Sequence, residues 1–334
     1  MQPSQRIKYK WMSISLGLSV ALMILKFTAW WLTSSTAVLT DALESIINVI
    51  ASGFALYSIY LSGQPRDRNH PYGHGKIEFF SSGFEGALIL SAGLFIIFQA
   101  IQSFSNPQPI TNLDWGVVLI ALTTVANALV GWLLIRNGRV TRSITLIADG
   151  RHLLVDSLSS LIVVVGIGLI WLTGLTWFDG LLSLILSGVI IFNGLGLIRH
   201  SVAGLMDETD LALLQRILDI LNQHKRSNWI DIHNTRVQRY GADLHIDCHL
   251  TLPYYWTLAQ VHQEVHEFEE VLKREIDTEV EIFIHVDPCL PECCHYCRIA
   301  DCPVRAHAFS GDVEWTIANI STNQKHFATE AEPN

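Results

Sequence analysis

The sequence predicts an α-helical membrane protein with six transmembrane helices, followed by a cytoplasmic α+β domain. Half of the 334 residues are hydrophobic, and only 16% are charged. The long apolar runs all lie before residue 207, whereas acidic residues gather after it. Residues 1–206 hold 12 Lys and Arg against 9 Asp and Glu, which gives +3. The net charge of the whole chain is −9, so residues 207–334 have a net charge of −12. We therefore divide the chain after residue 206.

Six runs are long enough to cross a bilayer, which takes about 20 mostly apolar residues. The expected spans are residues 12–33, 36–61, 79–104, 115–135, 157–178 and 180–198. We expect the first to be retained rather than cleaved, because it lacks a small-residue cleavage site and five more spans follow it. Charges inside the runs are few. We assign one of them, Glu85, to an ion pair with Lys26 rather than to a binding site.

The basic residues of the short loops predict the orientation of the membrane part. They precede the first span, lie between the second and third and between the fourth and fifth, and follow the sixth, while the other three loops have none. Because such residues stay on the cytoplasmic side, both termini are expected in the cytoplasm. We expect an integral protein of the bacterial inner (plasma) membrane.

The periodicity changes after residue 206. Residues 211–221 and 258–276 are patterned as amphipathic helices, and residues 230–238, 244–252 and 280–286 as strands. The order αββαβ predicts a small domain, residues 207–288, with helices on one face of a sheet. For residues 289–334 we expect a Cys-rich segment and then a disordered tail.

Polar side chains within the second and fifth spans point to a metal site. Glu44 and Asn48 share a helix face at i,i+4, and so do His152 and Asp156. Two helices packed through these faces would form a four-ligand cage of nitrogen and oxygen atoms, suited to a divalent transition metal. Asp41 lies beside this face, and we expect it to neighbour the site. The alternative is that these groups only hydrogen-bond to one another and hold the helices together.

A loop on the cytoplasmic side holds a second group of candidate metal ligands. Asp67, His70 and His74 lie in the loop between the second and third spans, where Pro71 and Gly73 bend the chain.

Ten of the 14 His lie after residue 206. Because residues two apart on a strand face the same way, His285 and Asp287 at the end of the last predicted strand point to one side of the sheet. The candidate ligands of the soluble domain are His233, His249, His262, His285 and Asp287.

Five of the six cysteines fall in the stretch CLPECCHYCRIADC: Cys289, Cys293, Cys294, Cys297 and Cys302. Thiols stay reduced in the cytoplasm, and this density suits thiolate metal binding. Only Cys294 and Cys297 have the C-x2-C spacing of a structural zinc site. Idle or redox-active thiols are the alternative.

Taken together, these residues resemble the cation diffusion facilitator family of divalent metal/proton antiporters. The matching motifs are AWWLT, NHPYGHGKIE, ADGRHLLVD and IHVDP. The resemblance implies a homodimer with a metallochaperone-like cytoplasmic domain and the three metal sites named above. It also implies a salt bridge between Lys76 and Asp207 near the membrane. Glu44 and Asn48 depart from the family pattern, which usually has Asp/Asp or His/Asp there.

The predicted function is efflux of a divalent transition metal from the cytoplasm by proton antiport and alternating access, so we expect a secondary transporter and not an enzyme. Zinc is the expected ion, with Fe²⁺ and Mn²⁺ as alternatives. The expected partners are a second copy of the chain, the lipid bilayer and protons, and no nucleic acid. A metal-responsive regulatory protein without transport stays open. So does an intramembrane metalloprotease, although no H-E-x-x-H motif is present.

Overall fold

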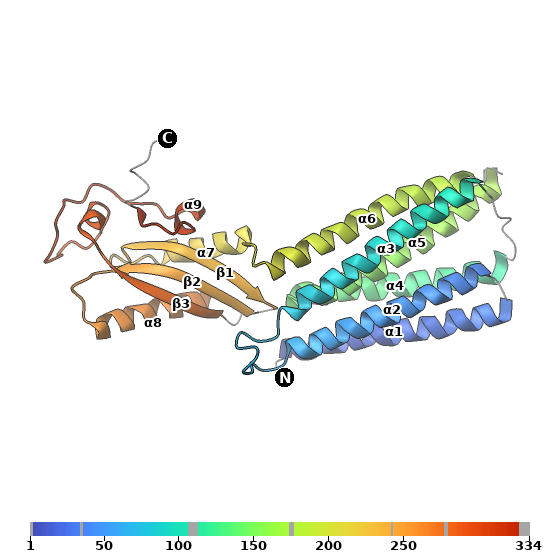
Figure 1. The fold of residues 1–334 in the computed structure, drawn as a ribbon, viewed down its shortest axis with the longest axis horizontal. Helices are drawn as coiled ribbons and strands as arrows, with labels where there is room; N and C mark the ends of the chain where they lie inside the picture. Colours follow the sequence, from blue (N-terminus) through green and yellow to red (C-terminus); the bar gives the residue numbers. More distant parts are fainter. Residues whose placement is uncertain are drawn as a thin grey trace. The chain divides into compact units, whose positions relative to one another are not determined.

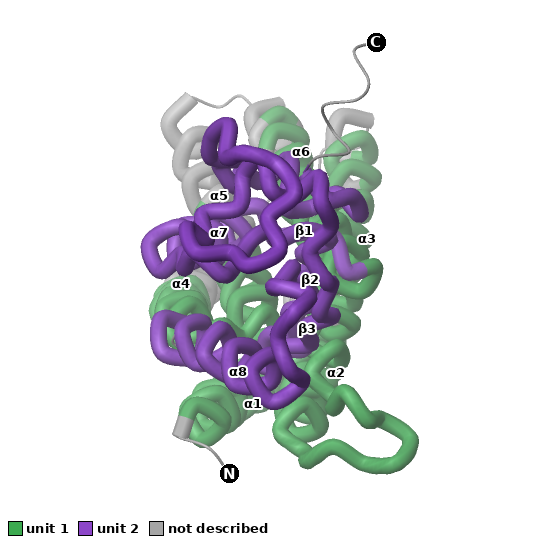
Figure 2. The backbone as a smooth tube through the Cα atoms, turned by 90° about the vertical axis from the view of Figure 1, so that its left-hand side faces the viewer, with its two compact units in different colours: residues 1–206 green, residues 207–334 purple. Residues whose placement is uncertain are grey.

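The computed structural model describes residues 3–33, 36–105, 113–173, 177–241, 243–276 and 280–326. The side chains of some helical residues, among them Asp41 and Glu44, lie outside the described set. The chain forms two compact units, drawn in different colours in Figure 2. Unit 1 is Met1–Met206 and unit 2 is Asp207–Asn334.

In its described residues, unit 1 consists of six long helices that run side by side (Figure 1). They are α1 (Pro3–Thr33), α2 (Thr36–Ser62), α3 (Ile77–Ser105), α4 (Leu113–Thr141), α5 (Ile144–Thr173) and α6 (Trp177–Leu205). Within the described part of the chain, four stretches are long and apolar enough to cross a membrane: Ser4–Thr28, Ser45–Ser62, Ile77–Gln102 and Ser187–Leu205. Large apolar side chains such as Phe98, Val125 and Phe192 are exposed on the helices, as suits contact with lipid.

The fifth helix differs from the expected span of residues 157–178. It begins at Ile144 and ends at Thr173, so it starts before the expected span, and it carries His152 and Asp156 as the predicted metal site requires. The sequence interpretation began this span after the last charged residue. A helix needs only its own backbone hydrogen bonds, however, and it continues through polar residues wherever neighbouring helices bury them.

Close backbone contacts fix α5 against α4 and α6 against α3. A Cβ atom added to Gly131 would lie 2.8 Å from the carbonyl oxygen of Gly150, and the reverse holds as well. Gly86 and Gly194 face each other in the same way at 3.0 Å. Small residues permit such an approach between membrane helices. The two contacts hold the turns that carry His152 and Glu85.

A buried ion pair joins the helices at one end of unit 1. Lys8 Nζ on α1 lies 2.8 Å from Glu78 Oε1 on α3, and both side chains are almost fully buried. Ser62 on α2 and Ser143, which precedes α5, donate further hydrogen bonds to this carboxylate. A buried pair of this kind is costly to break, because the remaining charge would be left without compensation.

Unit 2 contains a three-stranded sheet in the order β1-β2-β3, with two helices in its first part. The elements are α7 (Leu211–Gln223), β1 (Asp231–Tyr240), β2 (Asp243–Leu252), α8 (Leu258–Glu275) and β3 (Val280–Pro288). β1 pairs with β2 antiparallel, and β2 pairs with β3 parallel through the α8 crossover (Figure 1). Ile246 and Leu250 of the sheet, Ile217 of α7 and Phe268 of α8 belong to one buried core. The helices thus cover the even-numbered face of β2, which leaves the odd-numbered face for polar residues.

A β-bulge interrupts β1 next to His233. The register shifts between His233 and Arg236, and Asn234 adopts a φ of 52°. One extra residue in the strand reverses the alternation beyond it, so Ile232 and Val237 both reach the core although they lie five positions apart.

The segment after β3 differs from the expected disordered tail, since its residues 289–326 fold onto unit 2. It contains the short 3-10 helix η1 (Pro291–His295) and the helix α9 (Ile317–Ile320), which contacts β1 and α7. Trp315 and Ile320 are buried in the domain core. The ammonium group of Lys225 lies 3.8 Å from the centre of the Trp315 ring. A few apolar side chains therefore anchor a segment that is polar on average.

Candidate metal sites

Asn48, His152 and Asp156 meet where α2 packs against α5. The Asn48 Nδ2 atom donates a hydrogen bond to Asp156 Oδ2 at 2.8 Å, and His152 Nε2 lies 3.0 Å from Asn48 Oδ1. His152 Nε2 and Asp156 Oδ2 are 3.7 Å apart. The His152 side chain is 6% exposed and that of Asp156 is 18% exposed, so the group is largely shielded from bulk solvent. Three of the four predicted ligands of this site therefore come together, whereas the fourth, Glu44, and the neighbouring Asp41 lie outside the described side chains.

The distances in this group suit a single metal ion. In a tetrahedral site with bonds of about 2.0–2.1 Å, ligand atoms lie about 3.3 Å from one another. The separations of 3.0 and 3.7 Å around His152 Nε2 bracket this value.

Two buried acids beside this group were not assigned to it from the sequence. The Glu85 carboxylate on α3 is fully buried, and its Oε2 atom lies 3.9 Å from His152 Nδ1. It neighbours the site instead of standing apart from it with Lys26. Asp149 lies about one turn before His152 on α5 and accepts hydrogen bonds from Ser15 and Ser52. The arrangement of Glu85 depends on α3 meeting α5, which no periodicity within one helix reveals.

The loop between α2 and α3 brings its three predicted ligands together. Asp67 Oδ1 lies 3.1 Å from His70 Nδ1, and Asp67 Oδ2 lies 3.4 Å from His74 Nε2. All three could ligate one ion, since their ligand atoms lie within 4.8 Å of one another. Hydrogen bonds from the backbone of His70, with a further one from Asn69, lower the pKa of Asp67 and keep it ionised. Gly73 has a φ of 88°, a conformation that closes this turn.

Three histidines stand in one row across the sheet of unit 2. His233 pairs with His249 across β1 and β2, and His249 pairs with His285 across β2 and β3. Their ring centroids are 5.0 and 4.6 Å apart. Paired residues on neighbouring strands point to the same side, here the side opposite the helix-covered core. The strand register therefore gathers the three imidazoles.

Asp287 completes this group from two residues beyond His285. Its Oδ2 atom lies 3.3 Å from both His233 Nε2 and His249 Nδ1, and these three residues could share one ion. The exposed His285 lies 3.7 Å from Asp287 Oδ1 through its Nε2 atom. Burial lowers the pKa of His233, so its imidazole stays in the neutral form that binds metal.

Two predicted assignments, the ligand role of His262 and the salt bridge between Lys76 and Asp207, do not join the groups described above. His262 is exposed on α8 and does not belong to the metal-binding group formed by the described His233, His249 and Asp287. Lys76 belongs to unit 1 and Asp207 to unit 2, so the salt bridge between them stays a prediction.

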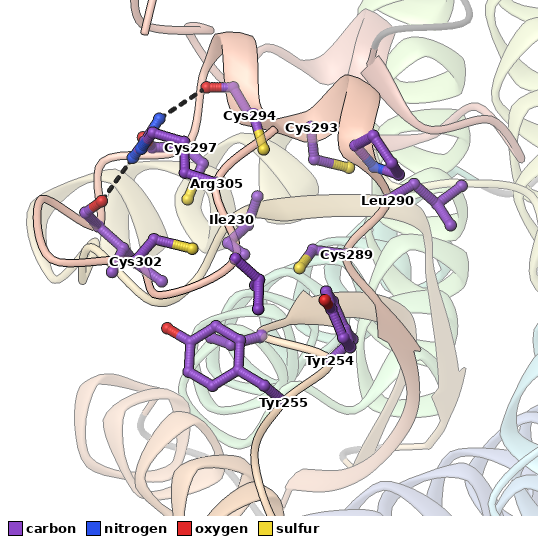
Figure 3. A pocket seen from close by; sticks show the side chains of 14 residues that line it. Ile230, Tyr254, Tyr255, Cys289, Leu290, Cys293, Cys294, Cys297, Cys302 and Arg305 are labelled. Carbon is purple, nitrogen blue, oxygen red and sulfur yellow. Dashed lines mark hydrogen bonds between the residues drawn. The ribbon is translucent and has the colours of Figure 1, made fainter. Parts of the chain in front are cut away.

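The five cysteines of the C-terminal segment line one cavity beneath the end of β3 (Figure 3). Cys293 and Cys297 are buried, and Cys289, Cys294 and Cys302 are partly exposed. Burial raises the pKa of Cys289, Cys293 and Cys297, so their unligated side chains are protonated thiols at neutral pH. Such thiols are poor nucleophiles, which disfavours a role as free reactive thiolates.

Comparison with known proteins covers both units. Residues 12–206 match the cation efflux transmembrane domain, and residues 210–289 match the cytoplasmic domain of cation efflux proteins. An uncharacterized transporter of Synechocystis sp. is 33% identical over 276 residues, which cover 82% of this chain and 88% of that protein. Metal tolerance protein C1 of Arabidopsis thaliana is 31% identical over 297 residues, which cover 83% of this chain and 61% of that protein. Cation-efflux pump FieF of Salmonella arizonae is 28% identical over 281 residues, which cover 82% of this chain and 90% of that protein.

Proposed function

Since this integral membrane protein belongs to the cation diffusion facilitator family, whose members export divalent metal cations, we propose that it exports zinc from the cytoplasm in exchange for protons. The observation that carries this proposal is the meeting of Asn48, His152 and Asp156 between two membrane helices. Ionisable groups inside a membrane domain are costly and usually serve transport or relay roles. The metal ion is the cargo of this site.

We propose that Glu44 joins these three residues as the fourth ligand. A metal ion would replace the hydrogen bonds that now connect Asn48 to His152 and Asp156. For this, His152 must offer an unprotonated Nε2 atom, and its other nitrogen then carries the proton. The Glu85 carboxyl group lies 3.9 Å from Nδ1 without a hydrogen bond between them, and we propose that it accepts one from this nitrogen when the metal binds, which favours that tautomer. Carboxylates commonly orient metal-binding histidines in this way.

Proton coupling follows from competition for the same ligand atoms. Imidazole and carboxylate groups bind metal only after they lose their protons, so metal and proton binding oppose each other. Imidazole exchanges its proton within the physiological pH range. When the site opens to the outside, protons displace the metal from His152 and the carboxylates. With Asn48 in place of an acid, fewer protons exchange for each ion than in an all-carboxylate site.

The packing of unit 1 supports alternating access by movement of two groups of helices. α3 and α6 pack most extensively against each other, with Gly86 and Gly194 in close contact. α1 pairs with α2, and α4 pairs with α5. We propose that α1, α2, α4 and α5 rock against the α3–α6 pair and carry the site from one side of the membrane to the other.

The cytoplasmic unit would sense the same ion. We propose that metal bound by His233, His249, His285 and Asp287 tightens a homodimer of this domain and favours transport. The salt bridge between Lys76 and Asp207 and the loop site at Asp67, His70 and His74 would act near the membrane. The basic loops favour cytoplasmic termini in a bacterial inner membrane.

Zinc suits the imidazole and carboxylate donors of a tetrahedral site. Fe²⁺ and Mn²⁺ are the competing cargoes, because oxygen donors such as Glu44 and Asn48 also suit harder ions. Competition between the three ions for transport ranks them directly.

The proposal is tested with purified protein in vesicles that carry an imposed pH gradient, with one dye for metal and one for protons inside. We expect zinc entry coupled to proton exit, driven by the gradient and inhibited by the preferred competing ion. Metal-independent proton leak, or zinc movement that ignores the gradient, would contradict antiport. A regulatory protein would show metal binding with no flux of either ion.

A further inference from the structure

The cavity beneath the end of β3 is larger than a single metal ion requires. It measures about 70 Å³, and its lining includes the thiols of Cys289, Cys294, Cys297 and Cys302 (Figure 3). One water molecule needs only about 10–15 Å³ on a comparable measure. A zinc ion held by four thiolates needs no such space, because its ligands close around it.

The separation of the thiols also differs from that of a mononuclear site. With Zn–S bonds of about 2.3 Å, tetrahedral sulfur ligands lie about 3.8 Å apart. Within the part of the chain that the structure describes, no three cysteine sulfurs lie within 4.8 Å of one another. Thiolates that bind different iron atoms of one cluster are spread farther apart, with the inorganic core between them. The cavity therefore fits a polynuclear centre better than one ion.

The spacing of the cysteines fits such a centre as well. Four residues separate Cys289 from Cys294, two separate Cys294 from Cys297, and four separate Cys297 from Cys302. The first three follow the C-x4-C-x2-C spacing of plant-type [2Fe–2S] proteins. Pro303 directly follows the last cysteine, as Pro does in the bacterial cluster-binding run.

Arg305 gives the cavity a fixed frame and a positive charge. Its guanidinium group donates hydrogen bonds to the carbonyl oxygens of Cys294 and Cys297, each at 3.1 Å, and also to that of Ile299. These bonds hold the loop between two of the thiols. The positive charge would offset the negative charge of a thiolate-bound cluster, which is one way in which a protein stabilises such a centre.

We propose that Cys289, Cys294, Cys297 and Cys302 hold an iron–sulfur cluster. Cys293 is the fifth thiol of the cavity lining, and we leave it out of the ligand set because it falls outside the C-x4-C-x2-C spacing of the other cysteines. The buried Ile230 and the partly exposed Tyr255 also line the cavity, and an apolar lining of this kind would limit solvent access to the cluster.

The cluster would be attached to the strand that carries the cytoplasmic metal group. Cys289 directly follows β3, and its backbone N–H donates to Leu252 O at the end of β2 at 2.9 Å. Asp287, which contacts His233 and His249, lies two residues before this cysteine. Loss of the cluster would loosen the end of that strand.

The test uses the full-length protein, purified without oxygen and treated with a chelator to remove loosely bound metal. We expect iron and acid-labile sulfide in equal amounts, together with the visible absorption of thiolate-bound iron. Iron at the His and carboxylate sites would bring no sulfide, so the result is independent of metal transport. Zinc without sulfide in the cysteine segment would overturn the proposal. Failure to take up a cluster after anaerobic incubation with ferric iron, sulfide and a thiol reductant would do the same.

Single substitutions then assign the ligands. Cys297→Ser and Cys302→Ser are expected to lose the sulfide and the visible absorption, whereas Cys293→Ser keeps both. Cys293 and Cys297 are similarly buried, so they are matched for any general effect on folding. Far-UV circular dichroism verifies that each variant is folded. Equal cluster content in all three variants, or equal loss in all three folded variants, would contradict the ligand set.

Discussion

The side-chain amide of Asn48 on α2 donates a hydrogen bond to the carboxylate of Asp156 on α5, with 2.8 Å between Nδ2 and Oδ2. The same amide meets His152 through its oxygen atom. A neutral residue at this position connects an imidazole and a carboxylate without adding charge. An aspartate there would place a second carboxylate next to Asp156.

Replacement Asn48→Asp is expected to increase the number of protons released when zinc binds. Two adjacent carboxylates share protons more readily than one, and metal binding must displace them. Calorimetric titration in buffers of different ionisation enthalpy measures the proton number. The control is Asn48→Ala, which removes a ligand atom and adds no acid. An unchanged proton number in Asn48→Asp would show that position 48 does not contact the ion.

Replacement Glu85→Gln is expected to weaken zinc binding by about 10–100-fold, the usual cost of removing a group that orients a metal ligand. The carboxyl group of Glu85 lies 3.9 Å from His152 Nδ1, and glutamine keeps its size but replaces one carboxyl oxygen with an amide nitrogen. Binding is measured by competition with a metal-sensitive dye. Glu85→Asp, which keeps the carboxyl group on a shorter side chain, should lose less. Wild-type affinity in Glu85→Gln would remove this acid from the site.

The structure confirms the predicted fold class. This class could be predicted because it depends on the spacing of apolar residues, which the sequence contains directly. Long apolar runs mark the membrane helices, and alternation marks the strands of unit 2. The helix α5 starts before the expected span of residues 157–178, because hydropathy favoured the uncharged residues after Asp156. The folded segment around Trp315 was missed because its few apolar residues have no regular spacing.

The tertiary relations of the candidate sites were harder to predict. The i,i+4 spacing of His152 and Asp156 is visible in the sequence, but the approach of Glu85 from α3 is not. The row of His233, His249 and His285 depends on strand register. That register includes a bulge in β1, and the pattern of residues in the sequence does not predict it.

The two histidine substitutions His249→Ala and His262→Ala are expected to differ in the cytoplasmic unit. His249 lies between its two partners in the row and 3.3 Å from Asp287, whereas His262 is exposed on α8. We expect His249→Ala to weaken metal binding by at least about 10–100-fold, with little change in His262→Ala. Metal-dependent dimerisation of the full-length protein, followed by light scattering, provides the readout. Equal losses in both variants would restore His262 to the ligand set.

The stability of unit 2 is expected to decrease above about pH 9 because of Cys248. Burial raises the pKa of this thiol from 9.0 to about 12. Between these values the unfolded chain loses the proton while the folded chain keeps it. The free energy of unfolding then falls by up to about 1.4 kcal/mol for each pH unit. Thermal unfolding of the detergent-solubilised protein measures this slope. Cys248→Ala should flatten it, and an identical slope in the variant would exclude the thiol as the cause.

The most direct test of the central claim compares the wild type with His152→Ala and Asp156→Ala in vesicles that carry a pH gradient. The proposed mechanism predicts that the wild type moves zinc with an opposite proton flux. Both variants should insert as folded protein yet lose the zinc flux and the metal-dependent proton flux together. Zinc transport at the wild-type rate in either variant would contradict the assignment of the transport site between α2 and α5.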